Sequence, residues 1–365
     1  MIERIFRTPL ESATGFPAEG AVGTLERLPK WLNLVPIVCQ WLWLSLRYRS
    51  ISLPSCANPA LTTGGMVGEG KMEYLEIMGT HASKATATTT CIIAYGSKSV
   101  GAVESAMATH GLTYPVVLKP DIGWCGYGVC KIDDRMGLDK YLAAFPLGET
   151  LVIQRWIDQP GEAGIFYMRR PGQATGVVIG MLLRHFPRVT GDGVHSVAEL
   201  MQADARARRL GRDGASRSCA NPHRVAKAGE VVRIATVGST RVGGLYEDGS
   251  ALVTPELACA IDAIARDMTQ FHAGRFDVKF TDLAALRSGT LTIIEVNGAG
   301  SEAVHAWDPS LTLAQAYRII FDKQRRLFAL SAAMRNRGHR PVGCVSLARH
   351  YVRQQKLISR YPPSN

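Results

Sequence analysis

Residues 114–129 read YPVVLKPDIGWCGYGV, a valine-rich stretch followed by a loop with three glycines. The stretch predicts a short buried strand that delivers Lys119 to the glycine-rich turn. Glycines let a backbone fold closely over an anion and point N–H groups at it, and a lysine adds a point charge. The segment is neither a Walker A sequence nor a Rossmann fingerprint, because no GK[ST] follows and no helix opens at the third glycine. It therefore predicts an anion-binding turn of moderate specificity.

Two later segments, FDVKF at 276–280 and LTIIEVNGAGSEAVH at 291–305, carry polar residues inside apolar strands. Strand alternation places Glu295 and Asn297 on one face, and Asp277 comes from a second strand that could pair beside it. Such buried groups cost free energy unless they are paired or bind a cation. Two carboxylates and a carboxamide are hard oxygen ligands of the kind that Mg²⁺ prefers. The two motifs together favour a metal site over an exposed edge with unrelated polar residues.

The remaining pattern mixes strands and helices without strict βαβ alternation, which indicates α+β layers rather than a doubly wound sheet. A chain of 365 residues is long enough for two or three domains. Strands are expected near 89–95, 113–120, 151–157, 174–186, 230–237, 276–280 and 290–296, and helices near 100–111, 137–145, 197–213, 255–272 and 311–335.

Composition narrows the setting of the protein. The eight cysteines include no CxxC pair and no cluster with histidine at zinc spacing, so reduced thiols in a cytoplasmic protein are expected. The net charge of +11 suits phosphate, a carboxylate-rich substrate or an anionic surface. No nucleic-acid partner is expected, because aromatic residues do not interleave with the arginine-rich runs.

The most apolar stretch is LNLVPIVCQWLWLSL at 32–46. It is too short for a comfortable transmembrane helix and it contains Pro36. The tryptophans and arginines within residues 32–49 would suit peripheral contact with a membrane surface. A helix that packs onto the body of the protein is the favoured interpretation of the same residues.

The order of VVLKP, a glycine-rich loop, LVIQRWI, GRFDV and IIEVN resembles the ATP-grasp superfamily over residues 70–330. The sequence is most similar to the D-alanine–D-alanine ligase and cyanophycin synthetase branches. The resemblance implies an α+β ATP-grasp fold, in which two α+β subdomains grip ATP between them. It divides the chain into an irregular, partly helical region at 1–70, a small subdomain at 71–153, a large subdomain with the metal site at 154–335 and a tail at 336–365.

The resemblance also implies an ATP site. Lys71 and Lys119 match the family's two nucleotide-binding lysines, and Lys84 is a rival for the first role. The glycine-rich loop would close over the β- and γ-phosphates, residues 154–157 would line the adenine pocket, and Glu162 would bind the ribose. The full implied set is Lys71, Lys119, Gly123, Gly126, Gly128, Gln154, Arg155, Trp156, Ile157 and Glu162. Family hinges often carry glutamate where Gln154 stands.

Catalytic and metal roles follow from the same match. Arg275 matches the arginine that steadies the transferred phosphoryl group, and Lys119 shares that task. Asp277, Glu295 and Asn297 match the ligands of Mg²⁺ or Mn²⁺. The turn GAGS at 298–301 is expected to present backbone N–H groups to an oxyanion. The candidate substrate residues are Arg233, Ser301, Glu302 and His305, with Arg184, Arg188, Arg217 and Arg241 as weaker candidates.

These features predict an ATP-dependent carboxylate–amine ligase, which forms an acyl phosphate and releases ADP and phosphate. Its partners would be small carboxylate and amine substrates, with an acidic acceptor mildly favoured by the net charge, and a homodimer stays open. Two alternatives are a kinase-like phosphotransferase and a non-catalytic nucleotide-binding or membrane-associated protein. The non-catalytic alternative is disfavoured, because a protein that has lost catalysis need not keep both carboxylates of the metal site.

Overall fold

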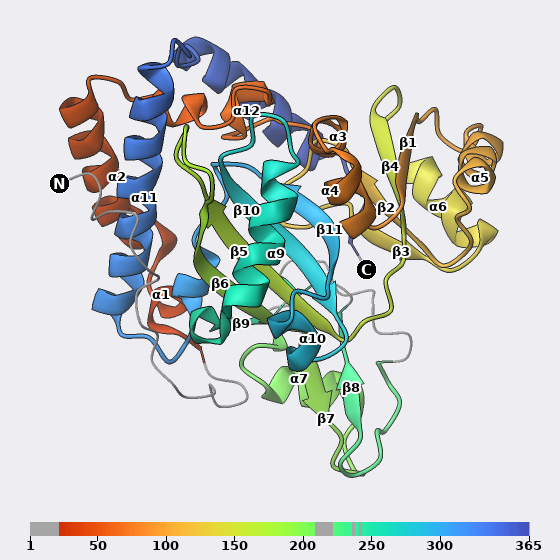
Figure 1. Cartoon of the computed structure of the whole chain (residues 1–365). Helices are drawn as coiled ribbons and strands as arrows, with labels where there is room; N and C mark the ends of the chain where they lie inside the picture. The colour runs from red at the N-terminus through yellow and green to blue at the C-terminus, as the bar shows by residue number, and fades with distance from the viewer. Residues whose placement is uncertain (1–21, 209–221, 236–237, 241–242, 365) are drawn as a thin grey trace.

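The computed structural model describes residues 22–208, 222–235, 238–240 and 243–364 (Figure 1). Two separate antiparallel sheets with helices packed around them make up its centre, which confirms the predicted α+β class. Within the described residues, no helix is both long enough and apolar enough to cross a membrane.

The smaller sheet contains the strand that was predicted to carry Lys119. It has the order β1-β4-β2-β3, with β1 at Thr89–Ile93, β2 at Val116–Pro120, β3 at Cys130–Ile132 and β4 at Thr150–Arg155. Every residue of β2 is buried, since β2 lies inside the sheet and its Val116 and Leu118 pack under two helices. These are α5 (Val100–Thr109) and α6 (Arg135–Ala144), at the right of Figure 1.

The larger sheet has the order β11-β10-β5-β6-β9. Its strands are β5 (Gly161–Met168), β6 (Val177–His185), β9 (Leu245–Asp248), β10 (Ala273–Phe280) and β11 (Thr292–Asn297). One face is apolar and packs against α3 (Lys71–Glu76), α4 (Thr80–Ala85) and α9 (Pro255–Arg266) in the largest hydrophobic core. Alternation leaves the polar residues of β10 and β11 on the opposite face.

Some element boundaries differ from the sequence prediction. The helix expected over 197–213 is α7 and ends at Ala203, where extended backbone at Asp204 ends the helix; residues 209–221 lie outside the described chain. The strand expected over 230–237 is β8 (Val231–Arg233), which pairs only with β7 (Arg188–Thr190). The helix expected over 255–272 ends at Arg266, because the chain then turns so that the Thr269 N–H bonds the Ile77 carbonyl.

The described part of residues 1–70 contains a long helix. After α1 (Thr24–Arg27), α2 (Lys30–Tyr48) lies alongside α11 (Leu313–Arg335), as Figure 1 shows at the left. The Trp41 ring meets Phe328 edge-on, with ring centroids 4.9 Å apart. Short 3-10 turns at Leu53–Cys56 (η2) and Thr62–Gly64 (η3) follow.

Residues 336–365, which were expected to form a tail, also contain a helix, α12 (Cys344–Ile358). The segment after this helix returns to the smaller sheet. There the Tyr361 ring stacks on Phe145, with centroids 5.8 Å apart, and the Cys130 thiol bonds the Pro363 carbonyl. Both ends of the described chain therefore pack onto the central sheets.

Candidate active site

A cavity of about 460 Å³ lies between the two sheets. The smaller sheet and its glycine-rich loop form one wall, the polar face of the larger sheet forms the opposite wall, and residues 66–71 with α12 close one end. The predicted residues that line it are Lys71, Lys119, Gly123, Gly126, Gln154, Arg155, Trp156, Ile157, Glu162, Arg275, Asp277, Glu295, Asn297, Ser301 and Glu302. Residues far apart in the sequence therefore share one cavity.

Strand pairing explains why four of these side chains meet. In the antiparallel pair of β10 and β11, Asp277 lies opposite Glu295 and Arg275 lies opposite Asn297. Directly opposed residues, and residues two apart on one strand, project from the same face of a sheet. Arg275, Asp277, Glu295 and Asn297 therefore form a polar patch at one edge of the large sheet.

Asp277 is the most tightly held group of this patch, and it is 1% exposed. Arg275 donates from Nε to Oδ1 at 2.7 Å and from Nη2 to Oδ2 at 2.9 Å. Arg184 of β6 and the Asn297 amide donate to Oδ2 at 3.2 and 3.1 Å. Burial alone would raise the pKa of Asp277, but the charges of Arg184 and Arg275 outweigh it and hold the pKa below its usual range.

A glycine makes room for these side chains. Gly164 of β5 pairs with Asp277, and a Cβ at this position would lie 3.0 Å from both the Arg275 Cδ and the Asp277 Oδ1. Both side chains would have to shift by a few tenths of an ångström.

We therefore expect Gly164→Ala to lower any turnover at this site by about tenfold, because small displacements of positioned groups are costly. Gly101→Ala on α5 is the matched control, since a Cβ there meets no atom within 4 Å. Steady-state ATP hydrolysis by the two variants measures the difference. Equal rates would contradict the role given to Gly164.

Glu162, predicted to bind a ribose, lies in a network of cations. Its Oε1 accepts from Arg184 at 2.7 Å, and its Oε2 is 3.3 Å from the Lys279 ammonium. Sequence reasoning gave Arg184 only as one of several arginines for a substrate carboxylate, and it missed Lys279. The signal for Lys279 was present, since alternation along FDVKF puts it on the same face as Asp277.

The two predicted nucleotide-binding lysines both interact with the charge of Glu295. Lys119 is buried and donates to the Gln154 Oε1 at 2.7 Å and to the Ile294 carbonyl at 3.1 Å. Burial lowers the pKa of Lys119, although the charge of Glu295 counteracts this effect. The Lys71 ammonium is 3.5 Å from the Glu295 carboxylate. The rival Lys84 is exposed on α4 and does not line the cavity.

The structure gives a physical reason for glutamine at position 154. Its Oε1 accepts from Lys119, while its Nε2 donates to the Thr89 hydroxyl at 2.9 Å and to the Ile294 carbonyl at 3.1 Å. A glutamate could accept from Lys119 but would turn a carboxylate oxygen toward the Ile294 carbonyl. The amide therefore ties β4 to β11 and links the two sheets.

The glycine-rich loop is held by the C-terminal segment. Tyr361 and Ser364 donate from their hydroxyls to the Ile122 and Gly126 carbonyls, each at 2.6 Å, and the Gln354 amide donates to the Gly123 carbonyl at 3.0 Å. Gly126 has a φ of 74°, which favours glycine. Gly128, with a φ of 73°, lies against Pro120 and Tyr361 and does not line the cavity.

Two of the candidate substrate residues lie outside the cavity. The Arg233 guanidinium stacks on the Phe186 ring, 3.5 Å from its centroid, and bonds the Ala235 carbonyl. His305 is buried against Phe166, and burial lowers its pKa to about 3. Of the weaker candidates, Arg188 lies on β7 opposite Arg233 of β8, and Arg217 and Arg241 lie outside the described residues.

The expected role of the turn at 298–301 is not met in this conformation. The Gly300 N–H donates to the Gly65 carbonyl at 2.8 Å, and the Ser301 N–H donates to the Gly298 carbonyl at 3.1 Å. These two donors are therefore occupied and do not point at an oxyanion. The close contact with residues 64–66, which sequence reasoning could not foresee, is the physical cause.

Lys323 of α11 lies behind the same turn, next to His305. Burial, together with the charge of Arg275, lowers its pKa to about 7. The folded state therefore binds fewer protons than the unfolded state above pH 7, so stability rises with pH until the unfolded lysine titrates.

We expect the unfolding free energy of wild type to rise between about pH 7 and pH 9 by up to about 1.4 kcal/mol per pH unit relative to Lys323→Met. Urea unfolding of both proteins at several pH values measures this difference. Curves that run parallel would show that Lys323 keeps an ordinary pKa in the folded protein.

The donor set fits a hard divalent cation and a polyphosphate. Asp277, Glu295 and Asn297 supply two carboxylates and an amide on adjacent strands, although the described residues contain no group of three His, Cys, Asp or Glu that could hold a metal. The cationic side chains that line the cavity include Lys71, Lys119, Arg155, Arg184, Arg275 and Lys279, against the carboxylates of Glu69, Glu162, Asp277, Glu295 and Glu302. Several of these cations are paired with carboxylates of the same cavity, and cationic side chains of this kind suit phosphates.

No protein-family model matches the sequence, and no curated protein matches it. Among solved structures, the chain is similar over 72% of its length to a bifunctional glutathione synthetase from Pasteurella multocida (17% identity, TM-score 0.36). It is similar over 73% to the VanG D-Ala:D-Ser ligase from Enterococcus faecalis (15%, 0.39) and over 76% to D-alanine–D-alanine ligase from Bacillus anthracis (13%, 0.41). The chain spans 38%, 64% and 71% of these three proteins, respectively.

Proposed function

We propose that this chain is an ATP-grasp ligase, which uses Mg-ATP to activate a carboxylate for attack by an amine. The observation that carries the proposal is the cavity between the two sheets. Lys119 and the glycine-rich loop enter it from one side, and Arg275, Asp277, Glu295 and Asn297 enter it from the other. Most of the motif residues that resemble those of the ATP-grasp superfamily line this cavity, which supports the proposal.

In the proposed reaction, the side chains of this cavity position and neutralise charge. Lys71 and Lys119 would bind phosphate oxygens, and the backbone of the glycine-rich loop would cover them. Asp277, Glu295 and Asn297 would hold Mg²⁺, which supplies charge neutralisation at the transferred phosphoryl group. Arg275, with its guanidinium beside the same patch, would stabilise the negative charge that develops as the carboxylate attacks the γ-phosphate.

Phosphate binding would change the contacts of Asp277. Its carboxylate now bonds both Arg275 and Arg184, so a cation could bind it only if these guanidinium groups turn partly away. An incoming triphosphate offers them new anionic partners. We infer that the arginines exchange Asp277 for phosphate oxygens when Mg-ATP binds.

The far end of the cavity favours an amine as the nucleophile. Residues 64–70 lie between the turn at 298–301 and α12, since Gly65 contacts Gly298 and Gly68 contacts His350. Three buried polar atoms at this end have no hydrogen-bond partner among the described residues: the Glu69 Oε2, the Ser301 Oγ and the Gln355 Nε2. Buried polar groups of this kind need a partner, and a bound ligand would supply it.

Two carboxylates line this end of the cavity, and the nearby Lys71 is paired with Glu295. The two carboxylates are those of Glu69 and Glu302, while Tyr351, Gln354 and Gln355 of α12 are neutral. Burial raises the pKa of Glu69, which makes its carboxylate a better proton acceptor from an ammonium group. A cationic amine fits this wall better than an acidic acceptor does, so we propose a cationic amine as the nucleophile.

We expect Glu69→Gln to raise the KM for the amine about tenfold, because one charge-assisted contact is lost, and to leave ATP binding unchanged. The variant keeps the shape of the side chain and the hydrogen bond from Tyr74. Steady-state kinetics with varied amine measures the effect. An unchanged KM would remove Glu69 from the acceptor site.

Product analysis tests the proposed function itself. Amino acids and dicarboxylates, alone and in pairs with amines, would be screened for ADP and phosphate release. Release of both only when a carboxylate and an amine are present supports the ligase. ADP without free phosphate would indicate the phosphotransferase, and no turnover with any pair would indicate a nucleotide-binding protein without catalysis. A cytoplasmic location is part of the proposal, in line with the reduced cysteines.

A further inference from the structure

The outer face of α2 is an exposed apolar surface. Trp31, Leu34 and Leu46 are 68%, 53% and 80% exposed, although large apolar side chains are usually buried. The exposed apolar side chains of this helix, together with Ile51 three residues beyond its end, are Trp31, Leu32, Leu34, Val35, Val38, Leu42, Trp43, Leu46 and Ile51. Positions 31, 34, 35, 38, 42 and 46 recur every three or four residues, so they share one face of the helix.

The inner face of the same helix is fully used by the protein. Leu44 is buried, and Trp41 and Tyr48 pack on Phe328 of α11. Backbone carbonyls of Asn33 and Tyr48 accept hydrogen bonds from α11 side chains. Helix α2 is therefore firmly packed against the rest of the protein. The exposure of its outward residues is not a result of loose packing.

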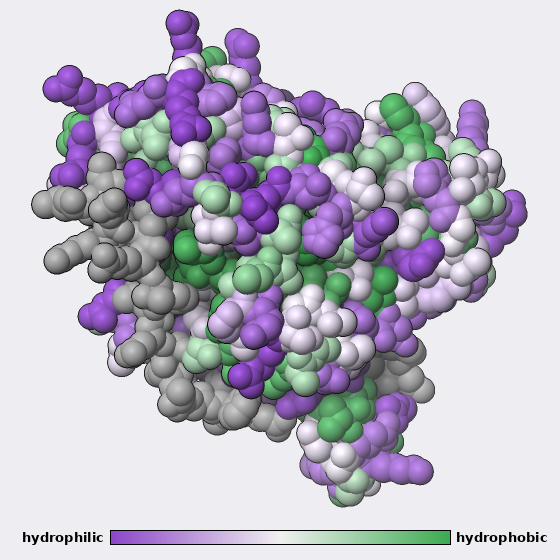
Figure 2. Space-filling view, in the orientation of Figure 1, coloured by the Kyte–Doolittle hydropathy of each residue, from purple (hydrophilic) through white to green (hydrophobic). Residues whose placement is uncertain are grey.

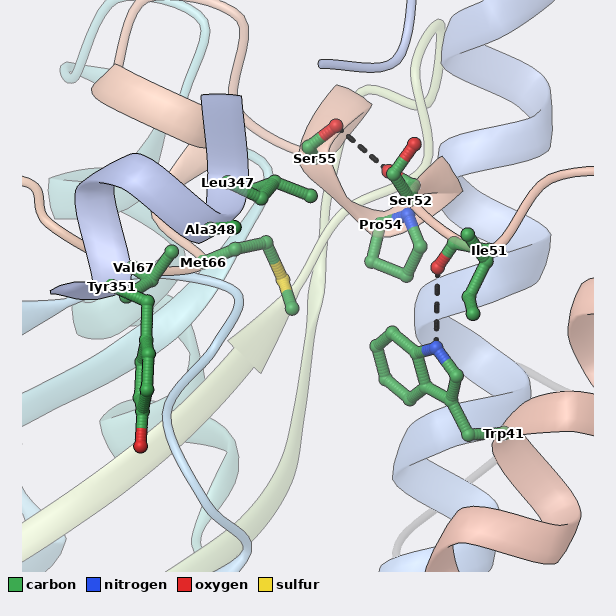
Figure 3. Close-up of a pocket in the computed structure, with 10 residues that line it drawn as sticks. All are labelled: Trp41, Ile51, Ser52, Pro54, Ser55, Met66, Val67, Leu347, Ala348 and Tyr351. Carbon is green, nitrogen blue, oxygen red and sulfur yellow. Dashed lines mark hydrogen bonds between the residues drawn. The ribbon is translucent and has the colours of Figure 1, made fainter. Parts of the chain in front are cut away.

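An apolar groove also lies between the C-terminal half of α2 and α12. The groove, of about 350 Å³, is lined at one end by Trp41 and Ile51 and at the other by Leu347, Ala348 and Tyr351. Figure 3 shows Met66 between Tyr351 on one side and Pro54 with Trp41 on the other. By contrast, the face shown in Figure 2 mixes hydrophilic and hydrophobic residues. An exposed apolar helix face of this kind marks a site of interaction.

Charge decides between the occupants of this face. Between Glu26 and Glu69 the sequence contains no Asp or Glu, and Arg47 and Arg49 are exposed at the end of α2. The Arg47 guanidinium lies 5.6 Å from the centroid of the Trp43 ring, at the boundary of the apolar face. A second copy of the chain would bring like charges together without any compensating carboxylate on this helix.

We propose that α2 docks the protein on an anionic lipid bilayer, lying in the plane of the surface. Its apolar side chains would enter the headgroup region, Trp31 and Trp43 would lie at the interface, and Arg47 and Arg49 would meet lipid phosphates. Figure 1 places α2 at the edge of the molecule opposite the smaller sheet, so docking would leave the cavity between the sheets open to small substrates. The sequence allowed either packing or membrane contact for this stretch. In the structure the inner face of α2 packs on the protein, and the outer face stays available for a membrane.

Vesicle sedimentation tests this docking. The full chain is mixed with phosphatidylcholine vesicles that contain either no phosphatidylserine or about one third phosphatidylserine. We expect binding to the anionic vesicles that weakens as salt rises from about 0.1 M to about 1 M. Leu42→Glu with Leu46→Glu should lower the bound fraction at least about tenfold, because it places two charges in the apolar face.

The matched control is Met136→Glu with Leu147→Glu, which adds the same charge at two exposed apolar residues of the smaller subdomain. It should bind like wild type, and circular dichroism checks that both variants fold. Equal binding by the two variants, or no binding by wild type, would overturn the proposal. So would a wild-type dimer in solution that the Leu42→Glu, Leu46→Glu variant converts to a monomer. Vesicle binding that appears only after residues 1–21 are deleted would also overturn it.

Discussion

Glu295→Gln is expected to lower ATP turnover by about 100- to 1,000-fold while the protein stays folded. The substitution keeps the size of the side chain and removes one of the two carboxylates proposed for Mg²⁺. Its only ion pair among the described residues is with Lys71 at 3.5 Å, and the Glu295 side chain is 30% exposed. Such partly exposed ion pairs contribute at most about 1 kcal/mol to stability. The substitution should therefore lower activity without unfolding the protein.

The matched control for that experiment is Glu76→Gln. Glu76 is exposed at the end of α3, the helix that starts at Lys71, and it does not line the cavity. Turnover is compared at several Mg²⁺ concentrations. A Glu295→Gln enzyme that matches Glu76→Gln at every concentration would contradict the assignment of Glu295 as a metal ligand.

Asp277→Ala is expected to behave differently, because it should destabilise the fold by about 3–5 kcal/mol. Asp277 is buried, and its loss leaves the guanidinium groups of Arg184 and Arg275 without this carboxylate. Loss of turnover in this variant would therefore not identify a metal ligand by itself. Urea unfolding of wild type and variant at neutral pH measures the effect, with Asp282→Ala on the exposed N-cap of α10 (Leu283–Arg287) as the comparison.

The difference in unfolding free energy between wild type and Asp277→Ala should depend on pH in one direction. The folded-state pKa of Asp277 lies below its usual value, so its contribution is present above the unfolded pKa of about 3.9 and is lost as the pH falls through the folded pKa. Wild type and Asp277→Ala should therefore converge in stability under acid conditions. A constant gap from neutral to acid pH would show that the ion pairs are not the source of the stability.

The sequence predicted the centre of this site because its signals are local. Alternation along TIIEVN and FDVKF fixes which side chains share a face, and the structure pairs Asp277 with Glu295 as that alternation allows. The valine-rich stretch before Lys119 is the fully buried β2. Both depend on residues that are neighbours in the chain, so no knowledge of distant contacts was needed.

Other parts of the site depend on contacts between distant segments, and these were not predicted. The N–H groups of Gly300 and Ser301 are occupied partly because residues 64–66 lie against the turn. Arg184 comes from β6, two strands away from Asp277, and only the sheet order brings the two together. The hydrogen bonds from Gln354, Tyr361 and Ser364 to the glycine-rich loop join residues more than 200 positions apart.

The N-terminal stretch shows a related limit. Periodicity indicated an apolar helix, but it could not tell which face would meet α11 and which would stay exposed. Trp41 and Tyr48 pack against α11, whereas Leu42 and Trp43 are exposed. All four residues lie close together in the sequence and have largely apolar side chains. The choice between packing and membrane contact therefore required the tertiary structure.

The central claim is that the cavity between the two sheets binds Mg-ATP, and calorimetric titration with a non-hydrolysable ATP analogue and Mg²⁺ tests it most directly. Wild type should bind one equivalent. Lys119→Met should bind at least about tenfold more weakly, because Lys119 is proposed to contact phosphate oxygens inside the cavity. Lys84→Met, at the exposed rival lysine, should bind like wild type. Equal affinity in wild type and Lys119→Met, or no binding by wild type, would contradict the account.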